Sequence, residues 1–212
     1  SFFSARKGIS ISDKLYQSVK SLAREEKTTP YIVLLTALNI LLARYFDNDD
    51  MRVATLVANR YRNEVENLIG HFVNTIILRA KISEELSFRE LAQVIKEITV
   101  AAHSNQDVPF EVLLQSLEKE AAIRCNILSP VLFVFQSEAQ PVILPNLTIS
   151  PLDDTQNTAT PEVTVTNFDL VMSVKERADG LTGFVIYKIL VFDERMINTL
   201  IRNFEALVER IV

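Results

Sequence analysis

Few side chains in this chain of 212 residues are suited to acid–base or nucleophilic chemistry near neutral pH. There are two histidines, His71 and His103, and one cysteine, Cys125. His103 falls at the end of a predicted helix, where a partly protonated imidazole meets the negative end of the helix dipole, so we expect it to cap that helix. Cys125 is expected to be a buried, inert thiol.

Several other chemistries lack the patterns they require. A zinc site needs clustered ligands, whereas the histidines and the cysteine are far apart in the sequence. The stretch from Asp47 to Asp50 carries three carboxylates without the ordered spacing of a calcium loop, so we expect a solvated turn and no metal. The sequence has no glycine-rich phosphate loop, and no nucleophile-elbow pattern supports a serine or cysteine nucleophile.

Asn74 stands out because it lies within a stretch, Phe72 to Leu78, that is otherwise almost continuously apolar. Such a stretch predicts a strand covered on both faces, hence a central strand of a sheet. A buried carboxamide without partners would cost on the order of 1–3 kcal/mol. Two interpretations stay open: a structural amide with all its hydrogen bonds made, or a group that faces a channel.

The surrounding pattern predicts one α+β domain over residues 1–212, a mixed β-sheet with helices packed mainly on one face. Ser12 and Asp193 are predicted helix caps, and Ser87 with Glu90 has capping-box spacing. Asp179-Gly180 between two β-rich runs predicts a hairpin. Residues 1–10 are expected to be a short lead-in segment, and residues 137–166 the least regular region. Helices are predicted at residues 12–27, 30–45, 64–68 and 87–103, and two more are predicted to begin at residues 109 and 194. Strands are predicted at residues 51–58, 72–78, 131–136, 168–177 and 181–190.

Composition excludes some classes of partner. The net charge is −5 and no basic run occurs, so nothing indicates binding to nucleic acid or to an anionic membrane. The longest apolar run, Tyr31 to Ala43, is too short for a bilayer span of roughly 20 residues. A single cysteine fits a reducing cytoplasm.

Two motifs carry a family resemblance. Residues 69–79, IGHFVNTIILR, and residues 105–111, NQDVPFE, resemble successive core motifs of the condensation domains of nonribosomal peptide synthetases, enzymes of secondary metabolism, in order and in separation. VANR at residues 57–60 resembles the segment that leads into the first motif, and similarity covers nearly the whole chain. The resemblance implies a chloramphenicol acetyltransferase-like lobe. It also implies amide formation between carrier-protein-bound aminoacyl or peptidyl thioesters.

The family's catalytic signature, HHxxxDG, occurs nowhere in the sequence. Because that signature belongs to the N-terminal half of the family, the chain resembles a C-terminal lobe without its N-terminal lobe, and the resemblance implies no catalytic residue here. Asn74, Gln106 and Asp107 are the implied substrate-channel candidates. One departure follows Arg124, where the family pattern DxSRNPL reads CNILSPV, which puts the polar contacts of that third motif in doubt.

The resemblance also implies the partners. They are the N-terminal lobe, donor and acceptor peptidyl carrier proteins and an adjacent adenylation domain, all cytoplasmic. No cofactor is expected to bind directly, since substrates would arrive on phosphopantetheine arms. An uncovered lobe interface would expose an apolar patch and favour self-association. The alternatives are a non-catalytic scaffold or carrier-protein-binding lobe, or part of an epimerisation or cyclisation domain, although Phe72 to Thr75 resembles condensation more than epimerisation domains.

Overall fold

A mixed six-stranded β-sheet, in the order β1-β8-β7-β4-β2-β3, organises the fold. The computed structural model describes residues 3–60, 62–121, 130–137, 142–144, 147–149 and 168–212. β4 pairs in parallel with β2 and β7, and the other neighbours are antiparallel. The strands are β1 (Ser4–Ser12), β2 (Asp50–Val57), β3 (Asn74–Lys81), β4 (Val131–Gln136), β7 (Leu170–Arg177) and β8 (Gly180–Lys188), with β5 (Val142–Leu144) and β6 (Leu147–Ile149) in a separate hairpin.

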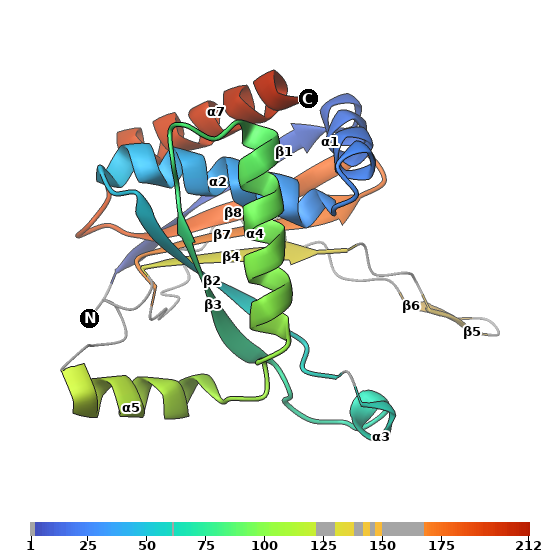
Figure 1. The fold of residues 1–212 in the computed structure, drawn as a ribbon. Coiled ribbons are helices and arrows are strands. Elements are labelled where there is room, and N and C mark those ends of the chain that lie inside the picture. The colour runs from blue at the N-terminus through green and yellow to red at the C-terminus, as the bar shows by residue number, and fades with distance from the viewer. Residues whose placement is uncertain (1–2, 61, 122–129, 138–141, 145–146, 150–167) are drawn as a thin grey trace.

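The helices gather mainly on one face of this sheet, which confirms the predicted α+β class (Figure 1). Helices α1, α2 and α7 lie together on that face, α4 crosses beside β3, and α5 lies apart below the sheet. The helices are α1 (Asp13–Glu25), α2 (Pro30–Phe46), α3 (Asn63–Glu66), α4 (Phe88–His103), α5 (Phe110–Ala121) and α7 (Glu194–Ile211).

The predicted caps are confirmed. The Asp193 carboxylate accepts a hydrogen bond from the Met196 N–H at 2.7 Å. Ser87 and Glu90 form a complete capping box, in which the Glu90 carboxylate accepts from the Ser87 N–H at 2.8 Å. These contacts satisfy N–H groups that have no partner within the helix, so each helix begins where a local sequence signal stands.

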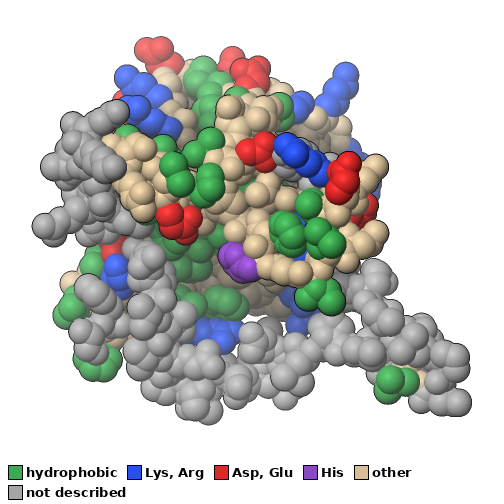
Figure 2. Space-filling view, turned by 90° about the horizontal axis from the view of Figure 1, so that it is seen from below, with side chains coloured by type: hydrophobic (Ala, Val, Ile, Leu, Met, Phe, Trp, Pro, Cys, Tyr) green, Lys and Arg blue, Asp and Glu red, His purple; other side chains and the backbone are tan. Residues whose placement is uncertain are grey.

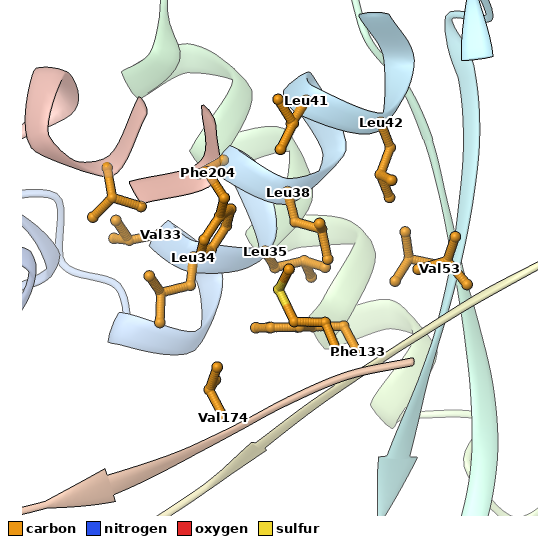
Figure 3. Packing of buried hydrophobic residues seen from close by; sticks show 14 of the residues in the cluster. Val33, Leu34, Leu35, Leu38, Leu41, Leu42, Val53, Phe133, Val174 and Phe204 are labelled. Carbon is orange, nitrogen blue, oxygen red and sulfur yellow. The ribbon is translucent and has the colours of Figure 1, made fainter. Parts of the chain in front are cut away.

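Helix α2 is the centre of the core (Figure 3). Its leucines point both toward Phe133 of the sheet and toward Phe204 of α7, and both phenylalanines are fully buried. The two polar residues of its buried part, Thr36 and Asn39, donate to backbone carbonyls one turn back, at 2.7 and 2.8 Å. Within the described residues no single helix is long and apolar enough to cross a membrane, and α1 and α2 meet such a criterion only as a pair bent by 102°.

The prediction of a central strand at residues 72–78 is wrong. β3 begins only at Asn74 and lies at the edge of the sheet, with β2 as its one neighbour. The apolar run arises because Ile76 and Leu78 face the helices, while Ile77 packs on the opposite face in a small cluster with Ala54. A strand can therefore have side chains packed on both of its faces and still lie at the edge of a sheet, with only one neighbouring strand.

The prediction that residues 1–10 form only a lead-in segment is also wrong, because β1 occupies Ser4–Ser12 at the other edge of the sheet. Ile9 and Ile11 of β1 are buried beneath the helices. The polar and small residues that make up the rest of β1, among them Arg6, Gly8 and Ser10, obscure the strand signal in the sequence. Cys125 and most of the motif that departs from the family after Arg124 lie outside the described residues, as does most of the region predicted to be irregular.

Candidate functional site

Asn74, at the start of β3, joins the sheet to the turn between α4 and α5. Its Nδ2 donates to the carbonyl oxygens of Gln106 and Val108, each at 2.8 Å. Its Oδ1 accepts from the N–H of Thr75 at 2.9 Å and from that of Phe110 at 3.1 Å. A carboxamide has two donor hydrogens and two acceptor lone pairs, so Asn74 uses its full capacity. We call this arrangement the Asn74 clasp.

The clasp places the three predicted channel residues together. Gln106 and Asp107 lie in the turn that Asn74 holds, so the two motifs separated in the sequence meet here. The Gln106 side chain is half-buried and that of Asp107 is exposed. The hydrogen bonds of the Asn74 side chain correspond to the first of the two interpretations, a structural amide with all its hydrogen bonds made. Any effect on a bound substrate would therefore pass through the turn.

Arg60 organises the loop before β3, a role that its place in the sequence does not indicate. Its guanidinium donates to the carbonyl oxygens of Val65 and Leu68 at 2.7 Å and of Gly70 at 3.0 Å. The same group lies 4.3 Å from the centre of the Phe72 ring, within the range of a cation–π contact. One side chain thus fixes the path of the loop from α3 to the start of the Asn74 clasp.

Replacing Arg60 with lysine is expected to loosen this loop. The planar guanidinium serves several carbonyls and the ring face at once, whereas an ammonium is a single point. We expect a loss of about 1–2 kcal/mol in the free energy of unfolding, since hydrogen bonds from charged donors are stronger than neutral ones but solvent partly replaces them here. Hydrogen exchange of residues 62–73 gives the local measurement.

The matched control is Arg202→Lys. The Arg202 guanidinium donates to the exposed Thr199 hydroxyl at 3.3 Å on the same helix, a local and solvated contact, so the same chemical change should have little effect. Equal exchange rates in the Arg60→Lys protein and the unmodified chain would contradict the role given to Arg60.

Several exposed apolar side chains lie on the segments that form the Asn74 clasp or adjoin it in the chain or the sheet. Val73 and Val108 flank it directly and are 45% and 52% exposed, while Ile69 is fully exposed. We define the apolar rim as these residues with their exposed neighbours on β2, the following loop and α5: Leu56, Leu68, Ile69, Val73, Val108, Val112 and Leu113. Seen from below, the side on which α3 and α5 lie, the molecule shows several groups of hydrophobic side chains between charged ones (Figure 2). Exposed apolar groups of this size are typical of surfaces that contact another protein when they lie together.

Ionisable groups do not assemble into a metal or acid–base centre in the described part of the chain. No group of three or more His, Cys, Asp or Glu side chains there is placed to hold a metal ion. Asp50, in the acidic turn, instead forms a bidentate ion pair with Arg79 at 2.8 and 2.9 Å, and this hydrogen bonding lowers the pKa of the Asp50 carboxyl. His71 and His103 are both exposed.

Comparison with known proteins adds a family match. The family model described as Condensation domain matches residues 1–212. A linear gramicidin synthase chain from Brevibacillus parabrevis is 34% identical over 200 residues, covering 94% of this chain and 4% of that protein. The nonribosomal peptide synthetase kk1B of Curvularia clavata is 32% identical over 203 residues, covering 95% of this chain and 2% of that protein. The chain thus spans only a few per cent of the length of these relatives.

Solved structures share the fold. The condensation domain from the monacolin K polyketide synthase MokA superposes with a TM-score of 0.80 at 18% identity, covering 97% of this chain and 46% of that one. The SgcC5 protein from Streptomyces globisporus gives a TM-score of 0.82 at 18% identity, covering 99% and 48%. The similarity therefore extends over nearly all of this chain and less than half of each solved chain.

Proposed function

Because this chain belongs to the condensation-domain family, we propose that it is the C-terminal lobe of a condensation domain that forms an amide bond between carrier-protein-bound thioesters. The observation that carries the proposal is the family match over residues 1–212, and the coverage of less than half of each solved chain supports the assignment to one lobe. The sequence lacks the family's HHxxxDG signature, and we assign that part of the site to the N-terminal lobe.

In the proposed reaction, the amine of the acceptor substrate attacks the carbonyl carbon of the donor thioester. The C–N bond forms, the C–S bond breaks, the thiolate leaves and the nitrogen loses a proton. The transition state therefore needs its reactants held in line and its carbonyl oxygen stabilised. This lobe would contribute positioning and no catalytic residue. Gln106 and Asp107, held by the Asn74 clasp, are its proposed channel residues.

The proposed partners are proteins. The apolar rim supports a contact with another folded surface, which we assign to the N-terminal lobe or to a carrier protein. Donor and acceptor carrier proteins would deliver substrates on phosphopantetheine arms, with an adenylation domain adjacent and no cofactor held by this chain. We assign this assembly to the cytoplasm. If the rim is not covered by a partner, copies of the chain should associate through it.

A second candidate is a carrier-protein-binding lobe without catalysis. Both histidines of this chain are exposed, which fits a binding-only lobe and equally fits the assignment of catalysis to the other lobe. Membership of an epimerisation or cyclisation domain is a third possibility, which would depend on the sequence of the N-terminal lobe.

An intact-mass assay of dipeptide formation between aminoacyl-loaded carrier proteins distinguishes these functions. The chain is tested alone and then with an N-terminal condensation lobe that carries HHxxxDG. The control is the same lobe with the second histidine of the signature changed to alanine. We expect product only with the unmodified lobe. Product from the chain alone would contradict the assignment of catalysis to the other lobe. If loading and folding are verified, absence of product in every arm would favour the binding-only function.

A further inference from the structure

Helices α2 and α7 border a groove of about 560 Å³ that is open to solvent and lies outside the Asn74 clasp and the apolar rim. Its apolar lining includes Ile40 and Leu41 of α2 and Leu207 of α7. Tyr45 and Asn203 also line it, and the Asn203 carboxamide donates to the Tyr45 hydroxyl at 3.1 Å, bridging the two helices. Both helices are anchored in the main core, so the groove is preformed.

Two arginines flank the apolar lining. Arg44 and Arg210 both line the groove and are both exposed. Each lies in the last turn of its helix, where a positive charge interacts favourably with the negative end of the helix dipole. Neither forms an ion pair with a described carboxylate, although the chain as a whole carries a net charge of −5.

The nearby carboxylates of α7 do not neutralise this groove. At 3.6 residues per turn, Glu205 and Glu209 each point about 160° away from Leu207 around α7, and Glu209 points about 100° away from Arg210. Burial, and to a smaller extent the nearby Glu209 carboxylate, raises the pKa of the Glu205 carboxyl, which is consistent with two acidic groups lying close together away from Leu207. The charged side chains that line the groove itself are therefore both cations, Arg44 and Arg210.

We propose that the groove between α2 and α7 binds an amphipathic helix of another polypeptide, with carboxylates beside its apolar stripe. The exposed seam between two helices offers a channel into which side chains of a third helix can pack, as in other helix-in-groove contacts. Apolar residues would fill the lining, and carboxylates would pair with Arg44 and Arg210. A small amphiphile fits less well because ligand pockets usually enclose most of the ligand surface, whereas this groove is open. Binding of such a helix does not depend on amide formation.

The test uses the 212-residue chain and two fluorescent helical peptides of about 20 residues, longer than the roughly 12–15 residues below which an isolated helix is marginal. One peptide carries leucines at helical spacing flanked by glutamates, and the other replaces each glutamate with lysine. We expect the glutamate peptide to bind and to shift the methyl NMR signals of Ile40, Leu41 and Leu207. The lysine peptide should bind at least about tenfold more weakly, and added salt should weaken the glutamate complex.

Charge reversal at the groove gives the second arm. Arg44→Glu with Arg210→Glu should weaken binding of the glutamate peptide by about tenfold or more and should favour the lysine peptide. Lys14→Glu with Arg24→Glu makes the same change in net charge on exposed positions of α1 and should leave affinity nearly unchanged. Circular dichroism verifies that all variants fold.

Several outcomes would overturn the proposal. These are no binding of the glutamate peptide at millimolar concentration, equal binding of both peptides, or methyl shifts confined to residues outside the groove. Dodecanoate that produces the same methyl shifts and displaces the peptide would identify the site as one for a free anionic amphiphile instead.

Discussion

Asn74→Ala is expected to lower the free energy of unfolding by about 2 kcal/mol, the scale for leaving several partly buried backbone groups without partners. The substitution removes donors from the carbonyls of Gln106 and Val108 and an acceptor from the Phe110 N–H. Water can replace some of the lost hydrogen bonds because Asn74 is only half-buried. Urea unfolding measures the global loss, and faster hydrogen exchange at residues 104–110 should show that the turn itself has loosened.

Two further variants make this prediction specific. Asn105→Ala removes a local hydrogen bond, at 2.9 Å, from a side chain just after α4 to the Ala101 carbonyl in the last turn of that helix, and should cost clearly less. Asn74→Asp keeps the acceptor contacts to Thr75 and Phe110 but puts a carboxylate oxygen against two carbonyl oxygens. It should therefore be at least as destabilising as alanine. An aspartate variant as stable as the unmodified chain would contradict the claim that the donated hydrogen bonds hold the turn.

The same variants connect the clasp to the proposed reaction. If Gln106 and Asp107 line the substrate channel, Asn74→Ala should slow amide formation in the two-lobe assay under conditions where the protein remains folded. Asn105→Ala should not. A slow reaction in the folded Asn74→Ala protein would support a positioning role exerted through the turn.

Much of the helical framework could be predicted because its signals are local. The Ser87–Glu90 capping box and the Asp193 cap act within one turn of helix, so their residue types mark the boundaries directly. The hairpin at Asp179-Gly180 is similar, since Gly180 adopts a φ of 129° that few other residues tolerate. The two core motifs likewise identified the residues that meet at the clasp.

The site itself depends on contacts that residue types do not encode. Asn74 reaches backbone groups 32 to 36 residues away, so its choice between structural amide and channel group could not be made from the sequence. The partners of Arg60 are carbonyl oxygens, which every residue possesses and which therefore leave no signature. The edge position of β3 is a property of topology, and apolar residues on both faces of a strand do not indicate how many neighbours it has.

Gly183→Ala is expected to cost about 3 kcal/mol or more, at the upper end of the range for overpacking. A Cβ at Gly183 would lie 2.8 Å from the Cα of Val174 and closer still to the Ser173 carbonyl oxygen, both in the backbone of the neighbouring strand β7. Backbone cannot move aside as a flexible side chain can. β7 and β8 would have to separate within the sheet, and the layer of α1, α2 and α7 packs on that sheet.

Gly8→Ala is the matched control, since Gly8 lies in the adjacent strand β1 and a Cβ there would meet nothing within 4 Å. Because glycine in a strand is less favourable than alanine by roughly 0.5–1 kcal/mol, this variant should be neutral or slightly stabilising. Urea unfolding of both proteins at one temperature gives the comparison. Equal stability of the two variants would mean that β7 and β8 can separate without loss, and would contradict the tight packing of these strands on which the core beneath α2 depends.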